Sequence, residues 1–144
     1  DTRLFSYLDA KGNENILNAP CAGQNGYNPR PLTMNGRDVY QFAIEAVPVC
    51  ITNVLNQANC TLDSIRYVIC HQANARIIST VSNRLDAPYG QFVENIENYG
   101  NTSAASIPIL LDELNRDNSL VRGDKIILVG FGGGLTWGAV LLEW

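Results

Sequence analysis

The sequence lacks most of the residues from which metal, nucleic-acid and membrane sites are built. Its single histidine, and the absence of a C-x-x-C pair among its four cysteines, argue against a tetrahedral zinc site. The 10 lysines and arginines are outnumbered by 14 aspartates and glutamates, and this acidic balance argues against DNA or RNA as a partner. No apolar run approaches the ~20 residues that cross a bilayer, so we expect no membrane-spanning segment.

What the chain does contain is the composition of a globular protein, with 46% hydrophobic and 17% charged residues. No internal repeat is visible, and residues 1–144 are predicted to form a single domain. We interpret the cysteines as buried thiols of a protein in a reducing compartment. They are Cys21, Cys50, Cys60 and Cys70.

Hydrophobic periodicity predicts strands that alternate with helices. Asn35 is predicted to cap the first helix, which Pro48 bends, and a connection rich in Gly, Asn and Pro precedes it at 22–31. The strands are expected at 4–8, 15–18, 65–70, 92–93, 125–131 and 135–143, and the helices at 35–54, 77–85 and 107–118. This order indicates an α/β protein with a mostly parallel core and right-handed crossovers.

His71 stands where the strand at 65–70 passes into the following helix. That edge of an α/β sheet is where ligands commonly bind, because loops and helix N-termini present hydrogen-bond donors there. The alternative is a structural histidine whose ring nitrogens are satisfied inside the fold. The placement alone leaves both interpretations open.

Asn101 occupies the same kind of position one unit later, between Gly100 and a run of small residues at 102–106. The local sequence favours a helix cap, in which the side chain accepts hydrogen bonds from backbone amides. Alternatively, the carboxamide donates outward into the cleft. We expect the two roles to compete, because one side chain cannot easily fill both.

The run GFGGG at 130–134 resembles a dinucleotide-binding fingerprint only superficially. That motif requires a helix after the glycines, whereas residues 135–140 are predicted to form a strand and Leu135 takes the place of the third glycine. We therefore reject nucleotide binding by this loop. The glycines suit either a tight hairpin, or a backbone that approaches a ligand closely or turns an amide into a site.

Three blocks of sequence, taken together and in this order, closely resemble the signatures of beta-ketoacyl-acyl-carrier-protein synthase III. They read HQANARI at 71–77, YGNTSAAS at 99–106 and GFGGGLTWG at 130–138, and the likeness extends from about Leu32 to the C-terminus. It implies the C-terminal half of a thiolase-like α/β fold, with a mixed, mostly parallel five-stranded sheet covered by helices. The start at Asp1, without an initiator Met, reads as though cut from a longer protein, and we expect an N-terminal half as partner.

The resemblance implies that His71 and Asn101 are the catalytic residues of a Cys-His-Asn site. Both would donate hydrogen bonds to the thioester carbonyl of malonyl-acyl-carrier protein, and so stabilise the enolate that forms as CO2 leaves. The enolate would attack an acyl group that a cysteine has taken from acyl-CoA. The implied contacts to substrate or CoA are Ala73, Asn74, Phe131 and Gly133, and the implied docking residues for the acidic carrier protein are Arg76, Arg84 and Arg37.

The same likeness implies the first condensation of fatty acid synthesis, with no cofactor or metal beyond the two thioester substrates. The complete enzyme would be a homodimer in the cytoplasm, with a plastid as the alternative. None of the four cysteines lies in the small-residue setting of the family's nucleophile, and Cys70 should project away from His71 on the preceding strand. We therefore expect the chain alone to be inactive.

Two related enzymes fit the sequence less well. A Cys-His-His synthase needs a second histidine, and chalcone-synthase relatives usually carry proline where this chain has Gly133. A different alternative is a catalytically silent partner subunit that binds carrier protein or CoA. The presence of both His71 and Asn101 counts against that alternative.

Overall fold

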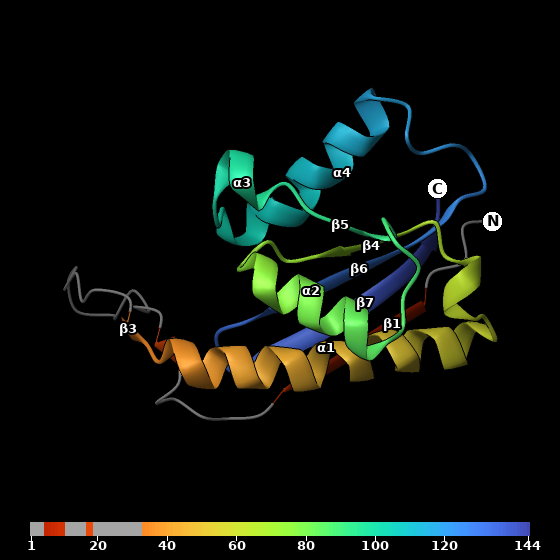
Figure 1. Ribbon diagram of the computed structural model, residues 1–144. Coiled ribbons are helices and arrows are strands. Elements are labelled where there is room, and N and C mark those ends of the chain that lie inside the picture. The colour runs from red at the N-terminus through yellow and green to blue at the C-terminus, as the bar shows by residue number, and fades with distance from the viewer. Residues whose placement is uncertain (1–4, 11–16, 19–32) are drawn as a thin grey trace, which may run out of the picture.

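The computed structural model describes residues 5–10, 17–18 and 33–144 (Figure 1). The predicted connection at 22–31, and Cys21, lie outside these residues. The strands are β1 (Phe5–Ala10), β2 (Leu17–Asn18), β3 (Thr33–Met34), β4 (Tyr67–Cys70), β5 (Phe92–Val93), β6 (Lys125–Gly132) and β7 (Thr136–Glu143). The helices are α1 (Gly36–Ala58), α2 (Ala75–Arg84), α3 (Ile96–Tyr99) and α4 (Ser106–Arg116), with single 3-10 turns at Leu62–Ser64 and Ser103–Ala105.

The central layer is a five-stranded sheet with the strand order β1-β7-β6-β4-β5, while β2 and β3 pair separately. β4 runs parallel to both of its neighbours, β5 and β6. β7 runs antiparallel to both β6 and β1, because the glycine-containing turn after β6 returns the chain directly beside itself. The mixed five-stranded sheet is confirmed, and its parallel pairings are confined to the half around β4.

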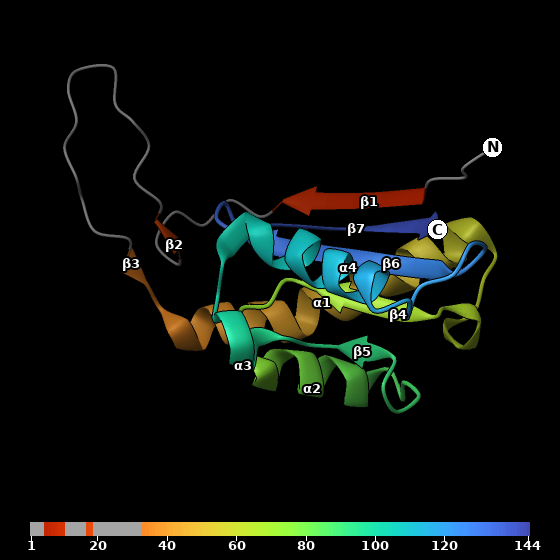
Figure 2. The same cartoon turned by 90° about the horizontal axis from the view of Figure 1, so that it is seen from above.

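Helices cover both faces of this sheet, as Figures 1 and 2 show: α1 and α2 lie on one face, and α3 and α4 lie on the other. Val68 of β4 packs into a core cluster with Val47 and Ile51 of α1, whereas the adjacent Ile69 packs with Leu110 of α4. Successive strand residues point to opposite faces, so a strand covered on both sides is apolar throughout. This explains the uninterrupted apolar runs in the sequence.

α1 begins as the sequence predicts and continues past its proline. The side chain of Asn35 accepts hydrogen bonds from the backbone amides of Arg37 and Asp38. Pro48 has no N–H, so the carbonyl of Ile44 four residues earlier loses its helical donor. The Arg84 guanidinium donates to this carbonyl instead, with Nη1 lying 2.6 Å from the Ile44 oxygen.

Candidate active site

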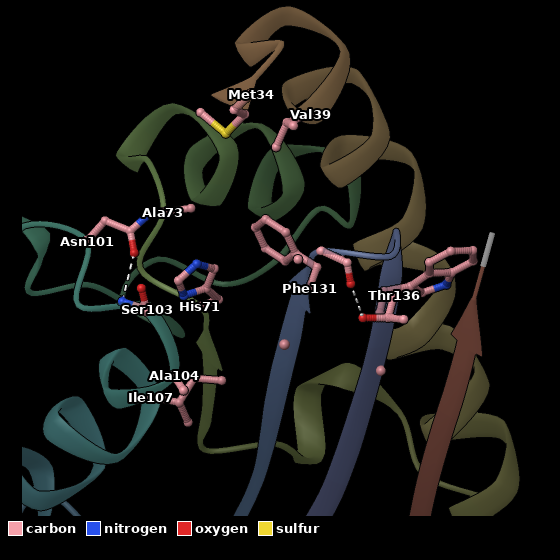
Figure 3. A pocket seen from close by; sticks show the side chains of 15 residues that line it. Met34, Val39, His71, Ala73, Asn101, Ser103, Ala104, Ile107, Phe131 and Thr136 are labelled. Atoms are coloured by element: carbon pink, nitrogen blue, oxygen red, sulfur yellow. Dashed lines mark hydrogen bonds between the residues drawn. The ribbon is translucent and has the colours of Figure 1, made fainter. Parts of the chain in front are cut away.

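A cavity of about 610 Å³ opens at the edge of the sheet where β4 and β6 end (Figure 3). Figure 3 shows His71 and Asn101 on one side of it and Phe131 and Thr136, from the β6–β7 hairpin, on the other. Met34 of β3 and Val39, in the first turn of α1, lie on the remaining side. None of the described residues that line the cavity is charged. The two predicted catalytic side chains therefore share one largely apolar cavity.

His71 is fixed by contacts on several sides. Its backbone N–H donates to the carbonyl of Val129 at 2.8 Å and extends the pairing of β4 with β6. Its Nδ1 lies 2.7 Å from the hydroxyl oxygen of Ser106, and its ring meets the Phe131 ring edge to face at 5.3 Å. Burial lowers the pKa of His71 below its ordinary value of 6.5, since desolvation disfavours the charged ring. The neutral form of the imidazole therefore predominates at pH 7.

Asn101 uses its two polar atoms for different purposes. The backbone N–H of Ser103 donates to Oδ1 of Asn101 at 2.9 Å, which is a cap-like contact at the start of the 3-10 turn. A carboxamide also has a separate NH2 group, and this contact leaves both of its N–H bonds to donate elsewhere. The cap-like contact is confirmed for the oxygen, and because the nitrogen has no hydrogen bond to a described residue, donation from it into the cavity that Asn101 lines stays a prediction.

A polar network, buried at Gln72 and Asn95 and exposed at Tyr99, joins the segment before Asn101 to the end of β4. Gln72 is 1% exposed, and its Nε2 donates to the Cys70 carbonyl at 2.9 Å while its Oε1 accepts from the Asn95 backbone at 3.1 Å. Asn95 Nδ2 and the Tyr99 hydroxyl each donate to Glu113 of α4, both at 2.6 Å. These bonds hold the two strand-to-helix junctions in one arrangement.

The glycine-rich loop forms the hairpin that one interpretation predicted, and it also lines the cavity; a close approach of its backbone to a ligand stays a prediction. Phe131 and Gly133 are part of the lining, and the Thr136 hydroxyl donates to the Gly133 carbonyl at 2.9 Å. A strand, β7, follows the loop, so the helix that a dinucleotide site needs is absent after these glycines. Phe42 of α1 supports the hairpin from behind through ring contacts with Phe131 and Trp137.

The other predicted site residues divide into two groups. Ala73 lines the cavity together with Phe131 and Gly133, whereas Asn74 caps α2 by accepting from the Arg76 backbone at 2.9 Å. Arg37 and Arg76 are exposed in the first turns of α1 and α2, two and three residues along the chain from the lining residues Val39 and Ala73. Arg84, at the far end of α2, uses its side chain to bond α1.

The described cysteines are not arranged as nucleophiles toward this cavity. Burial, and then the neighbouring Cys50, raise the pKa of the Cys70 thiol from 9.0 to about 12, so that it stays protonated. None of Cys50, Cys60 and Cys70 lines the cavity. Within the described part of the chain no cluster of three or more His, Cys, Asp or Glu side chains could hold a metal ion, and no helix is long and apolar enough to cross a membrane.

The sequence did not predict the apolar side chains that line the cavity, or the contact of Ser106 with His71. Met34, Val39 and Ile107 line the cavity, yet in the sequence Val39 and Ile107 are ordinary apolar helix positions and Met34 precedes the helix cap. Ser106 stood in the small-residue run after Asn101, and its position at the first turn of the predicted helix was the one available signal. Its contact with a histidine 35 residues earlier depends on the packing of the two junctions.

Comparison with known proteins identifies the fold and the family. The Thermus thermophilus structure of beta-ketoacyl-acyl-carrier-protein synthase III superposes with a TM-score of 0.88 at 36% identity, over 97% of this chain and 45% of that one. The corresponding Aquifex aeolicus structure gives 0.86 at 39% identity, over 97% of this chain and 44% of that one. The molecule therefore has the C-terminal half of a thiolase-like condensing-enzyme fold.

Sequence relatives agree with the structural ones. The chain is 42% identical over 151 residues to beta-ketoacyl-acyl-carrier-protein synthase III of Porphyra umbilicalis, which covers 100% of this chain and 44% of that protein. It is 51% identical over 113 residues to the Clostridium novyi protein of the same name, and the match covers 78% of this chain and 35% of that protein. A family model described as 3-oxoacyl-(acyl-carrier-protein) synthase III C terminal matches residues 55–144. The chain belongs to this family, and it spans less than half the length of these relatives.

Proposed function

We propose that this chain supplies the two hydrogen-bond donors of a condensing site that begins fatty acid synthesis. In that reaction a malonyl thioester on acyl-carrier protein loses CO2 and joins an acyl group derived from acyl-CoA. The single observation that carries the proposal is the convergence of His71 and Asn101 on one cavity whose described lining is otherwise uncharged. The names of the sequence relatives support the choice of reaction.

The two donors act on the thioester oxygen. As the bond between the carboxylate and the malonyl carbon breaks, its electron pair moves into the thioester and leaves an enolate with a negatively charged oxygen. Nε2–H of the neutral His71 and Nδ2–H of Asn101 donate to that oxygen. Donors that are already aimed avoid the reorganisation that water would need, and the apolar lining strengthens their effect.

The enolate carbon then attacks the acyl thioester on a cysteine, and the cysteine leaves as a thiolate. The backbone amide of Gly133 is proposed to stabilise the oxyanion of that step, and Ala73 and Phe131 to contact the thioester arm. None of Cys50, Cys60 and Cys70 lines the cavity and Cys70 stays protonated, which supports the proposal that an N-terminal half supplies the nucleophile.

Decarboxylation of malonyl-carrier protein, measured with the chain joined to its cysteine-bearing half, tests the donor roles. We expect His71→Ala and Asn101→Ala each to lower the rate by about a hundredfold to a thousandfold, the usual cost of losing one such donor. Asn115→Ala, at an exposed position of α4, is the matched control and should keep the parent rate. If both site variants match the parent, the donor assignment is wrong.

The same experiment separates the alternative of a silent partner subunit. Such a subunit would bind carrier protein while the assembled protein releases no CO2 from malonyl-carrier protein. No observation on the cavity favours that alternative over the condensing site.

Carrier-protein docking is assigned to Arg37 and Arg76, which are exposed beside the cavity on an acidic chain. Electrostatic attraction between such side chains and an acidic partner raises the association rate. Arg76→Glu should weaken carrier-protein binding and leave the turnover of a small malonyl thioester intact. Arg122→Glu, with the same charge change in the turn before β6, is the control. Equal losses on both substrates for Arg76→Glu would count against docking.

A further inference from the structure

The hydroxyl of Ser106 is held between the two strand-to-helix junctions. Ser106 is the first residue of α4, only 2% exposed, and it is not part of the cavity lining. Its Oγ lies 2.7 Å from Nδ1 of His71 and 3.2 Å from the backbone nitrogen of Gln72. The hydroxyl therefore touches the histidine from inside the fold.

Counting donors and acceptors determines which way these hydrogen bonds run. The Gln72 backbone N–H can only donate, so Ser106 Oγ accepts from it. If Nδ1 of His71 also carried a proton, Oγ would accept twice and its own buried hydrogen would have no acceptor among the described residues. If the hydroxyl donates to an unprotonated Nδ1, the Gln72 N–H, the Ser106 hydroxyl and Nδ1 of His71 all have partners. A buried donor left without a partner disfavours its arrangement by about tenfold or more.

We propose that Ser106 is a positioning residue that keeps His71 in the tautomer with its proton on Nε2. The effect of this tautomer on catalysis rests on the proposed function. With the proton on Nε2, the neutral imidazole can donate from Nε2 to a thioester oxygen. The other tautomer would present a bare nitrogen lone pair to the oxygen and repel the enolate.

Among the described residues around the His71 ring, Ser106 is the group that can select the tautomer. No described residue bonds Nε2 of His71, and the Phe131 ring and the apolar lining supply no charge that selects a tautomer. Cys70, the residue before His71, has a thiol pKa of about 12 and stays neutral. Because burial keeps the imidazole itself uncharged, the choice between two neutral tautomers remains, and the Ser106 hydroxyl is the group that contacts the deciding nitrogen.

Nuclear magnetic resonance of isotopically labelled histidine tests this directly. His71 is the only histidine of the chain, and a His71→Gln variant identifies its ring signals. The parent should show one tautomer with the proton on Nε2, and Ser106→Thr, which keeps a hydroxyl, should show the same. In Ser106→Ala both ring-nitrogen shifts should move toward the average of two tautomers. Ser106→Cys, similar in size with a weaker donor, should move them the same way if the alanine variant does not fold.

Two results would overturn the proposal: a parent protonated on Nδ1, or identical ring-nitrogen shifts in the parent and in the folded variants that lack the hydroxyl. In the decarboxylation assay kcat of Ser106→Ala should fall about tenfold, less than on removal of a direct donor, with KM nearly unchanged and with rescue by Ser106→Thr. Ser79→Ala, on the exposed side of α2, is the control. If His71→Ala is as active as the parent, the proposed function fails, while the tautomer of His71 still decides the role of Ser106.

Discussion

The unit β4–α2, which carries His71, and the unit β5–α4, which carries Asn101, are held in different ways. β4 lies between two strands, and α2 is bonded to α1 through Tyr40 to Thr80 at 2.9 Å and Arg84 to the Ile44 carbonyl. β5 is a two-residue edge strand, and the loop after α3 leaves Asn101 exposed. The proposed donor His71 is positioned by packing, and the proposed donor Asn101 by backbone conformation and a few polar contacts. Disturbing the first should therefore cost stability, and disturbing the second should cost activity.

Of the changes that test this comparison, Gly100→Ala should have the largest effect. Gly100 has a φ of +68°, a region that side chains rarely adopt, so alanine there should cost about 1–3 kcal/mol or shift the loop. A displaced Asn101 should lower decarboxylation by about tenfold to a hundredfold, because a shift near 1 Å has that effect on catalytic geometry.

Gly90→Ala is the matched control, since Gly90 has a φ of +78° in the turn before β5, away from the cavity. Both variants should lose similar free energy of unfolding in urea, and only Gly100→Ala should lose activity. Equal activity in the two would show that the loop conformation does not position Asn101.

On the other unit, Arg84→Ala should lower stability by about 1–3 kcal/mol, because the Ile44 carbonyl then lacks a partner in a partly buried place. In a Pro48→Ala background the restored helical N–H at position 48 should recover much of that loss. Arg116→Ala is the control: Arg116 pairs with Asp112 on the surface, where the bond is worth at most about 0.5 kcal/mol. Urea unfolding of Arg84→Ala, Pro48→Ala, the double variant and Arg116→Ala measures these free energies. If Arg84→Ala costs no more than Arg116→Ala, the Ile44 contact does not hold α2 on α1.

A smaller effect is expected for Tyr99→Phe, which removes one of the two donors to Glu113. Because that network holds the segment before Asn101, kcat for decarboxylation should fall severalfold. Tyr89→Phe, at a fully exposed tyrosine, should change nothing. An unchanged kcat in Tyr99→Phe would assign the positioning of Asn101 to Gly100 and Ser103 alone.

The smallest effect concerns pH. The folded-state pKa of His71 lies below the unfolded value of 6.5, so the unfolded chain binds a proton more readily. The stabilisation from the neutral ring is fully present above pH 6.5 and is lost as pH falls toward the folded-state pKa. The ring is only half-buried, so the loss should be less than about 1 kcal/mol. As the pH is lowered from 7 to 5, the urea midpoint should fall in the parent and fall less in His71→Gln. Parallel pH dependences in the two proteins would contradict the lowered pKa of His71.

Much of this architecture could be predicted from local patterns, and what could not depends on contacts between distant segments. The Asn35 cap, the strand that leads to His71 and the hairpin after β6 each follow from a few neighbouring residues. The bond from Arg84 to Ile44 joins residues 40 apart, and no local rule assigns an arginine to the carbonyl that Pro48 leaves free. For Asn101 the local sequence predicts the cap-like contact, but that this contact uses only the oxygen follows from the orientation of the Ser103 amide.

The alternation of Val68 and Ile69 between two core clusters has a consequence for how this protein tolerates change. β4 is only four residues long, so its position is a compromise between helices on opposite sides. A volume change in either layer would tilt the strand, and the imidazole attached to its end would move with it. Substitutions in interior positions that contact β4 should therefore change turnover in addition to lowering stability.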